Sequence, residues 1–440
     1  TGVNGGLVVV VADDPSMHSS QNEQDSRFYG KFAMIPVLEP SSQQEAYELT
    51  RYGFELSEKY KLPVMLRITT RLAHSRSAVE RSEELNENEL GLPSDLKQFI
   101  LLPSLARKRY KMLLSAQAKL EMESGGSGVN RIEKGTDVNR GIIACGLAYN
   151  YYQEVAIEAG LKFPVLKISQ YPVPTKMLNE FVSSVDEVVV LEEGNPMLEE
   201  SLTGVLKNQY IVKGRLDGTL PRDGELNPRL VGNAMGLDDK GGVPVPAIVK
   251  NRPPALCKGC SHIDMYNALN EALGEYGPGR VFSDIGCYTL GALPPYNAIN
   301  SCVDMGASIT MAKGASDAGM HPSVAVIGDS TFTHSGMTGL LDAVVEETPV
   351  TVIISDNSTT GMTGGQKSHA TNRLEEICKG IGVDQEHIRM MNPLKKHHEE
   401  NRKIMENELA YEGVSVIIAQ RECIQTAGRS LKSQKSKAKS

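Results

Sequence analysis

The sequence predicts an α/β protein built from open parallel-sheet domains arranged in series along the chain. Short apolar runs recur, helical patterns separate them, and charged or glycine-rich segments divide the chain into three parts. Apolar runs of this kind suit parallel strands that helices cover on both faces. A chain of 440 residues also exceeds the length that one hydrophobic core usually supports, so we expect two or three domains.

The first domain is expected over residues 1–92. Residues 7–12 and 64–68 are apolar runs, and residues 42–60 between them have a helical pattern, which predicts a β-α-β unit. Because the chain enters its first apolar run soon after Thr1, we expect that strand to be buried and the front part of this domain to be missing.

A linker and a second α/β domain are expected next. A charged helical pattern begins near residue 93, and Gly125-Gly126-Ser127-Gly128 predicts a flexible break after it, so residues 93–128 are interpreted as a helical connection and linker. The second domain is expected over residues 129–250. Its predicted strands are residues 142–145, 165–168, 187–191 and 210–213.

The third domain, expected over residues 251–428, shows the same alternation. Its predicted strands are residues 280–283, 324–327, 350–354 and 414–418, and its predicted helices include residues 306–318 and 336–347. Residues 429–440 are rich in Lys and Ser and are interpreted as a basic, disordered tail.

Charge and composition argue against several classes of function. The net charge of −8 and the isoelectric point of about 5.7 do not suit a nucleic-acid-binding surface, which needs clustered Lys and Arg. No apolar run approaches the roughly 20 residues that a membrane span needs, and no signal peptide is evident. We therefore expect a cytoplasmic protein that binds neither nucleic acid nor membrane.

Polar residues follow two predicted strands of the third domain. Gly328-Asp329-Ser330 comes directly after the first strand, and Asp356-Asn357-Ser358-Thr359 follows the next. The carboxyl ends of parallel strands meet at one edge of a sheet, where ligands bind. Asp329, Asn357 and the main-chain carbonyl of Thr359 are therefore candidate ligands of Mg²⁺, which takes few protein oxygens and completes its shell with phosphate. Each motif alone is also typical of an ordinary turn or helix cap.

Seven cysteines include the pair Cys257-Lys258-Gly259-Cys260, whose spacing lets both thiolates reach one metal centre. In a reducing compartment such a pair indicates metal or redox chemistry, and it fits a structural zinc site about as well as an iron–sulfur cluster. Cys287 and Cys423 follow predicted strands at the same edge and favour the cluster. A lone histidine is more often a hydrogen-bonded structural residue, so His262 is left out of the ligand set. Cysteines without a predicted role are Cys145, Cys302 and Cys378.

These motifs together resemble a known family. The pair Gly328-Asp329-Ser330 and Asp356-Asn357 is similar to the signature of thiamine-diphosphate enzymes. The longer string from Asp356 to Gln366 resembles the 2-oxoacid:ferredoxin oxidoreductases, and the indolepyruvate type most closely. The resemblance implies serial parallel-sheet domains of the thiamine-diphosphate-binding type. The residues implied to bind thiamine diphosphate and Mg²⁺ are Gly328, Asp329, Ser330, Asn357 and Thr359.

The same resemblance implies a 4Fe-4S cluster and a structural type for each domain. The implied cluster ligands are Cys257, Cys260, Cys287 and Cys423. Residues 1–92 would form a pyrimidine-binding-type domain, residues 129–250 a transketolase C-terminal-like domain, and residues 251–428 a diphosphate-binding-type domain with the iron–sulfur site. The family more often has Gly where this chain has Ser330, a change that leaves the neighbouring Asp329 in place.

A dense polar run from Asp13 to Arg27 follows the first predicted strand. Composition alone favours a solvated loop. The run also resembles the family's front-domain loop, which makes His18, Ser19 and Arg27 possible substrate-loop residues. The family's activating Glu lies in a segment that would precede Thr1, so no catalytic residue is assigned within this chain. A ferredoxin-like region of the family also has no counterpart here, and we expect a separate ferredoxin or a missing piece to supply it.

The resemblance implies oxidative decarboxylation of aryl 2-oxoacids of the indolepyruvate type to acyl-CoA, with electrons passed through the cluster to ferredoxin. The implied partners are a beta subunit of the same enzyme, ferredoxin, coenzyme A and an aryl-pyruvate substrate, and we expect an oligomer. Two alternatives stay open. One is a non-oxidative thiamine-dependent 2-oxoacid decarboxylase, which needs no cluster. The other is a catalytically incomplete fragment or a zinc-stabilised assembly module.

Overall fold

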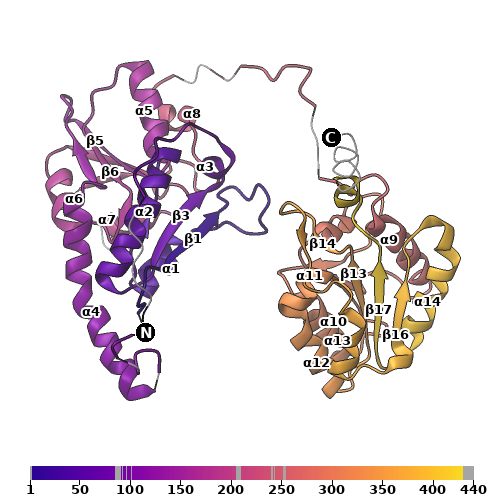
Figure 1. The fold of residues 1–440 in the computed structure, drawn as a ribbon. Coiled ribbons are helices and arrows are strands. Elements are labelled where there is room, and N and C mark those ends of the chain that lie inside the picture. The colour runs from indigo at the N-terminus through magenta and orange to yellow at the C-terminus, as the bar shows by residue number, and fades with distance from the viewer. Residues whose placement is uncertain are drawn as a thin grey trace, which may run out of the picture. The chain divides into compact units, whose positions relative to one another are not determined.

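The structure is a computed structural model of the chain, which forms two compact units, Thr1–Pro244 and Val245–Ser440. It describes residues 2–84, 91, 93–95, 97–100, 102–204, 210–238, 241, 243–250 and 254–429. Figure 1 shows strands flanked by helices in both units, so the predicted α/β fold class is confirmed. Over the described ranges, no helix is both long enough and apolar enough to cross a membrane.

The first unit contains two sheets. One has the strand order β1-β3-β2-β7, with bounds Val8–Asp13, Val64–Thr69, Val37–Leu38 and Gln170–Tyr171. The other has the order β4-β6-β5-β8-β9, with bounds Arg131–Glu133, Val165–Ile168, Arg140–Cys145, Glu187–Leu191 and Ile211–Lys213. The helices of this unit are α1 (Arg27–Ala33), α2 (Gln43–Tyr60), α3 (Thr70–His74), α4 (Pro103–Gly126), α5 (Ala148–Ala159), α6 (Thr175–Val182), α7 (Met197–Thr203) and α8 (Pro228–Ala234).

The two sheets of the first unit share a hydrophobic core. Val37 and Met65 of the four-stranded sheet belong to the same buried cluster as Ile143 and Leu166 of the five-stranded sheet. Strand β7 comes from the middle of the chain but pairs antiparallel with β2. Residues 1–92 and 129–244 therefore belong to one compact unit, whereas residues 245–250 fall in the other.

The expectation of a buried first strand is wrong. Among the described residues, strand β1 lies at the end of its sheet's strand order and pairs with β3 alone. Val9 and Val10 are 39% and 58% exposed. The apolar run predicts a strand correctly, but an apolar run does not reveal whether that strand lies at the edge or the centre of its sheet.

The expectation of a flexible break at Gly125 is also wrong. Helix α4 begins at Pro103, where proline suits the first helical turn, and it continues through Gly125 to Gly126. Ser124 is buried and its hydroxyl donates to the carbonyl of Pro172 at 2.6 Å. This tertiary contact stabilises the last turn of the helix and offsets the low helix propensity of Gly125 and Gly126.

The second unit is a parallel sheet between two helical layers. The strand order is β11-β10-β12-β13-β17-β16, with bounds Ser301–Cys302, Val281–Ser283, Val324–Gly328, Val350–Asp356, Val414–Gln420 and Ile388–Met391. A small hairpin of β14 (Thr359–Thr360) and β15 (Gln366–Lys367) follows β13. The helices are α9 (Ser261–Ala272), α10 (Ala307–Asp317), α11 (Asp329–Thr331), α12 (Met337–Val345), α13 (Leu374–Ile381) and α14 (His398–Ala410).

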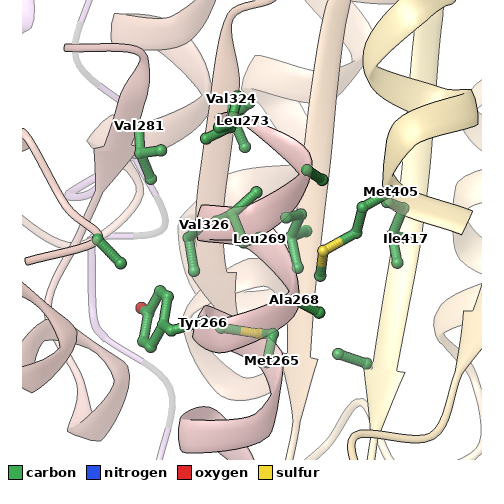
Figure 2. Packing of buried hydrophobic residues seen from close by; sticks show 14 of the residues in the cluster. Met265, Tyr266, Ala268, Leu269, Leu273, Val281, Val324, Val326, Met405 and Ile417 are labelled. Carbon is green, nitrogen blue, oxygen red and sulfur yellow. The ribbon is translucent and has the colours of Figure 1, made fainter. Parts of the chain in front are cut away.

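Alternate side chains of this sheet face two separate cores. On one face Val326 and Ile417 pack against α9 and α14, and Figure 2 shows Leu269 and Met405 of these helices beside them. On the other face Ile327 belongs to the core formed with α10, α12 and α13. This packing fixes helix α9, whose first turn begins directly after Cys260.

The predicted strands of this sheet are confirmed, and three of them extend further at their carboxyl ends. They continue to Gly328, Asp356 and Gln420. The added residues are small or polar, yet they still pair across the sheet: Ser355 lies beside Ala419 and Asp356 beside Gln420. The apolar pattern in the sequence stops one or two residues before the strand does. The reason is that strand pairing depends on hydrogen bonds of the backbone and not on the side chain.

Candidate functional site

The carboxyl ends of adjacent parallel strands meet at one edge of the second unit's sheet. Strand β12 pairs with β13 so that Gly328 lies beside Ser355, and β13 in turn pairs with β17. Asp329 directly follows β12 and Asn357 directly follows β13. The carbonyl of Asn357 accepts a hydrogen bond from the N–H of Cys423 at 3.1 Å. Polar loops that are far apart in the sequence are thereby joined at this edge.

Asp329 is a buried carboxylate with an unsatisfied oxygen. Its side chain is 3% exposed, and Oδ2 has no hydrogen-bond partner in the part of the chain that the structure describes. Burial, with repulsion from the carboxylate of Asp356, raises the pKa of Asp329 to about 6, while the Ser368 hydroxyl acts in the opposite direction. A buried oxygen without a donor is unfavourable. A divalent cation would satisfy it, so this carboxylate fits the role of a Mg²⁺ ligand.

The other predicted ligands lie in the loop after β13. Asn357 and Thr359 are both buried, and Oδ1 of Asn357 accepts from the N–H of Thr359 at 3.2 Å. The hydroxyls of Ser330 and Thr360 are 3.0 Å apart, which ties this loop to the one after β12. The structure thus brings the predicted diphosphate-binding residues to one edge of one sheet.

Gly328 is a position where only glycine fits. A Cβ atom at this residue would lie 2.5 Å from Cε1 of Tyr288. The Tyr288 hydroxyl bonds to the carboxylate of Asp284 and donates to the carbonyl of Ile285 at 3.2 Å, so the ring has little freedom to move. Tyr288 therefore packs directly on the end of β12, beside Asp329.

The four predicted cysteine ligands line one cavity of about 280 Å³, which we call the cysteine cavity. Cys257 and Cys260 precede α9, Cys287 follows β10 and Cys423 follows β17. Asn357 lines the same cavity. Burial, together with the charges of the three other cysteines, raises the pKa of the Cys287 thiol to about 11. The four thiols are thus close enough to affect one another's ionisation.

All four cysteines line the wall of this one cavity. Across the described residues, no group of three or more His, Cys, Asp or Glu side chains could hold a metal ion. A tetrahedral zinc site needs sulfur atoms about 3.8 Å apart, because each Zn–S bond is about 2.3 Å long. In a 4Fe-4S cluster each thiolate binds a different iron, which requires a wider ring around a hollow. Four thiols around one cavity are the arrangement that a cluster bound by four thiolates requires.

His262 also lines the cysteine cavity, although the sequence analysis leaves it outside the ligand set. It is 1% exposed, its Nδ1 lies 2.7 Å from the Ser355 hydroxyl, and its ring meets Tyr288 edge to face with centroids 6.2 Å apart. Burial lowers the pKa of His262 to about 4, so the imidazole is neutral near pH 7. Its position two residues after the cysteine pair was the available signal. No comparable signal marks Ser355, which lies in an apolar strand.

The residues of the front loop fall into two environments. His18 and Ser19 are exposed. Nε2 of His18 lies 3.2 Å from the carboxylate of Glu225, and the N–H of Ser19 donates to Oδ2 of Asp14 at 2.7 Å. Their side chains are accessible from outside the first unit.

Arg27, in contrast, belongs to a buried network of charges. Its guanidinium pairs with Asp25 and with Glu192 at 2.8 Å, and it donates to the carbonyl of Asn195. Burial lowers the pKa of Arg27, but carboxylates including those of Asp25 and Glu192 outweigh it and raise the pKa well above its ordinary value. Arg67 forms a second centre of the same network. Arg27 therefore fastens the front loop to the segment that follows β8.

Comparison with known proteins adds three findings. The family profile described as "Thiamine pyrophosphate enzyme, C-terminal TPP binding domain" matches residues 284–418. The chain is 38% identical over 454 residues to the indolepyruvate oxidoreductase subunit IorA of Methanothermobacter thermautotrophicus, a match that covers 97% of this chain and 73% of that protein. The IorA subunit of Archaeoglobus fulgidus is 38% identical over 449 residues, with coverage of 96% and 71%.

A solved structure also matches part of the chain. The 2-oxoglutarate:ferredoxin oxidoreductase from Magnetococcus marinus, with 2-oxoglutarate, coenzyme A and succinyl-CoA bound, gives a TM-score of 0.33 at 18% identity. That match covers 40% of this chain and 66% of the other. It is too partial to bear on the site, whereas the sequence relatives extend over nearly the whole chain.

Proposed function

The chain belongs to the family of indolepyruvate oxidoreductase IorA subunits, and on that basis we propose that it carries out thiamine-diphosphate-dependent oxidative decarboxylation of aryl 2-oxoacids. The match of residues 284–418 to a thiamine pyrophosphate enzyme domain supports the cofactor. The observation that supports the redox part is that Asn357 belongs both to the loop after β13 and to the wall of the cysteine cavity. One residue thus links the two proposed cofactor sites.

Asp329, Asn357 and the carbonyl of Thr359 are proposed to hold Mg²⁺ and, through it, the diphosphate, next to Gly328 and Ser330. The unsatisfied Oδ2 of Asp329 supports this assignment. When bound, thiamine diphosphate supplies the electron sink that allows a 2-oxoacid to lose its carboxylate. The chain's own contribution is to hold the cation at a buried edge of the sheet, where few water molecules compete for it.

Cys257, Cys260, Cys287 and Cys423 are proposed to hold a 4Fe-4S cluster that passes electrons to ferredoxin one at a time. The observation that supports this assignment is that all four cysteines line one cavity. A non-oxidative decarboxylase would have no use for such a cavity beside its cofactor loop.

We also propose a beta subunit, ferredoxin as electron acceptor, coenzyme A as acyl acceptor and an aryl-pyruvate as substrate, in an oligomeric enzyme. The relatives are named as subunits, which supports a partner chain. His18 and Ser19 are proposed to face substrate because their side chains are exposed, and Arg27 to hold their loop in place. The proposed domains are pyrimidine-binding-type at residues 1–92, transketolase C-terminal-like at 129–250 and diphosphate-binding-type at 251–428.

The proposal is tested on the full chain purified without oxygen. About four irons and four sulfides per chain are expected, together with visible absorption that bleaches with dithionite. After assembly with the beta subunit, indolepyruvate with coenzyme A should reduce a viologen dye when thiamine diphosphate and Mg²⁺ are present. Zinc without sulfide would overturn the redox assignment in favour of an assembly module. Release of carbon dioxide by a protein without iron would instead identify a non-oxidative decarboxylase.

A further inference from the structure

His262, which lines the cysteine cavity, forms a buried polar pair with Ser355 behind it. Their side chains are 1% and 3% exposed, and Nδ1 of His262 lies 2.7 Å from Oγ of Ser355. His262 is in the first turn of α9, two residues after Cys260, and Ser355 is two residues before Asn357 in β13. The pair therefore spans from the cysteine side of the cavity to the strand that leads into the proposed Mg²⁺ loop.

The surroundings determine which nitrogen of the imidazole carries the proton. The bond to His262 is the one hydrogen bond found for the Ser355 hydroxyl within the described residues. A buried hydroxyl hydrogen needs an acceptor, so Ser355 donates to Nδ1. The proton of the neutral ring is then on Nε2, because the hydrogen bond at one nitrogen sets the state of the other. The N–H at Nε2 is therefore a hydrogen-bond donor without a partner among the described residues. It belongs to a residue that lines the cavity.

The ring is also prevented from turning away. Tyr288 meets it edge to face at an interplanar angle of 81°, and Met265 and Leu269 hold the next turns of α9 in a fully buried core. The main-chain N–H of His262 already bonds to the Cys260 thiol. Main-chain and side-chain donors of one residue are therefore both available to a sulfur-rich centre.

We propose that His262, oriented by Ser355, donates a hydrogen bond from Nε2 to the iron–sulfur centre and raises its reduction potential. An N–H donor stabilises the more negative, reduced form of a cluster, so it makes the centre a better acceptor of the electrons released by decarboxylation. No proton is transferred, and His262 is not a ligand of iron. This inference rests on the proposed function, since it requires a cluster in the cysteine cavity.

The test is a redox titration of the cluster, followed by electron paramagnetic resonance, in the full chain purified without oxygen. His262→Leu removes the donor. At the wild-type midpoint potential we expect the ratio of reduced to oxidised cluster to fall tenfold, a downward shift of about 59 mV for one electron. Ser355→Ala keeps the imidazole but frees Nδ1, so a smaller downward shift is expected. His262→Gln keeps an N–H donor on a flexible side chain that Ser355 no longer orients, and it should give a shift between those of the wild type and His262→Leu.

His398→Leu is the matched control. His398 bonds to Glu271 at 2.8 Å near the other end of α9, and it does not line the cysteine cavity. This variant should titrate like the wild type. The same shift in His398→Leu as in His262→Leu would overturn the inference, because it would show a general effect on α9.

Other outcomes separate this inference from the function on which it rests. Wild-type protein without iron and sulfide would overturn the proposed function, and this inference with it, before any variant is made. A full cluster in His262→Leu with an unchanged midpoint would overturn only the inference. If His262→Leu does not assemble a cluster, Ser355→Ala and His262→Gln decide. Loss of the cluster in all three would overturn the inference, because the pair would then be needed for assembly and not for the potential.

Discussion

Asp329 and Asp356 lie at the carboxyl ends of two paired strands, and burial of Asp329 together with the charge of Asp356 raises the pKa of Asp329 to about 6. The Asp356 carboxylate accepts hydrogen bonds from the N–H and hydroxyl of Ser358 and, at 2.8 Å, from Nε2 of Gln420. Two neighbouring carboxylates in a buried site repel each other when both are ionised. A divalent cation would remove this repulsion and satisfy the free oxygen of Asp329 at once.

The first prediction is that Asp329→Asn weakens binding of Mg²⁺ and thiamine diphosphate. Asparagine keeps the shape of the side chain but removes its charge, and the loss of a charged buried contact is worth about 1.5–3 kcal/mol, or roughly 10- to 100-fold in affinity. Titration calorimetry measures it. Asp342→Asn is the control, because Asp342 is 57% exposed on α12. Equal affinity in wild type and Asp329→Asn would contradict the assignment.

The second prediction concerns the cysteine cavity. Cys287→Ser should lower the iron and sulfide content of the protein, because a serine hydroxyl is a poorer ligand for iron than a thiolate. Cys302→Ser is the control: Cys302 is also partly accessible and near the same sheet edge, but it does not line the cavity. Iron and sulfide assays on both proteins decide the matter. An equal loss in the two variants would count against a specific ligand role for Cys287.

The third prediction follows from the contact between Gly328 and Tyr288. Gly328→Ala places a methyl group 2.5 Å from the Tyr288 ring, and overpacking of this kind destabilises by about 1–3 kcal/mol. Urea unfolding should show it. Gly314→Ala, in helix α10, meets no atom within 4 Å and should be neutral or stabilising by up to about 1 kcal/mol. Similar stabilities for the two variants would mean that the Tyr288 ring can move aside.

The fourth prediction concerns the buried ion network of the first unit. Arg27→Leu leaves the carboxylates of Asp25 and Glu192 buried without their partner, which should cost about 3–5 kcal/mol of unfolding free energy. Arg51→Leu, which breaks a partly exposed contact with Glu55, should cost less than about 1 kcal/mol. Denaturant unfolding of both variants, at the same pH and salt concentration, makes the comparison.

The fifth prediction is a pH dependence that originates at Glu193. Burial, with the charges of Glu225 and Glu39, raises the pKa of Glu193 from its ordinary value of 4.5 to about 6. Between these pH values the folded unit binds more protons than the unfolded chain, so this residue's contribution to stability is complete below pH 4.5 and is lost as the pH rises through about 6. Near neutral pH, Glu193 therefore lowers the stability of the folded unit.

Glu193→Gln, which cannot ionise, should therefore gain stability over the wild type as the pH rises. Since one pKa unit corresponds to about 1.4 kcal/mol, the gain between about pH 4.5 and 7.5 should be roughly 2 kcal/mol. Urea unfolding at a series of pH values measures the difference between the two proteins. A constant difference across the series would show that Glu193 titrates normally. The partly exposed Glu187→Gln serves as a comparison, because its pKa is lowered and its pH dependence has the opposite sign.

The sequence predicts the strands of the second unit well because their valines and isoleucines are buried on both faces. It does not predict that β1 lies at a sheet edge, since Val9 and Val10 have the same composition as buried strand residues. Nor does it predict the helical state of Gly125, which depends on a contact of Ser124 with a segment distant in sequence.

Some residues of the candidate site could likewise be predicted from the sequence, and others could not. Asp329 and Asn357 could be proposed from local motifs, because each directly follows a strand. The pair of His262 and Ser355 could not, because it depends on α9 packing over the end of β13, which no pattern within either segment encodes. Cys423 became a candidate because it follows a predicted strand, and the family resemblance gave it the role of a ligand. Its position beside Asn357 comes from the pairing of β13 with β17, which is a property of the sheet order.

The cysteine cavity is lined from both ends of the second unit, since Cys257 and Cys260 precede its first described strand and Cys423 follows its last. A metal centre bound to all of them would cross-link the beginning and the end of this unit. Closing so long a loop reduces the conformational entropy of the unfolded chain and so favours the folded state. Oxygen that destroyed the centre would therefore remove a cross-link as well as an electron carrier, and the damaged protein would be digested by proteases sooner than protein whose substrate site was merely blocked.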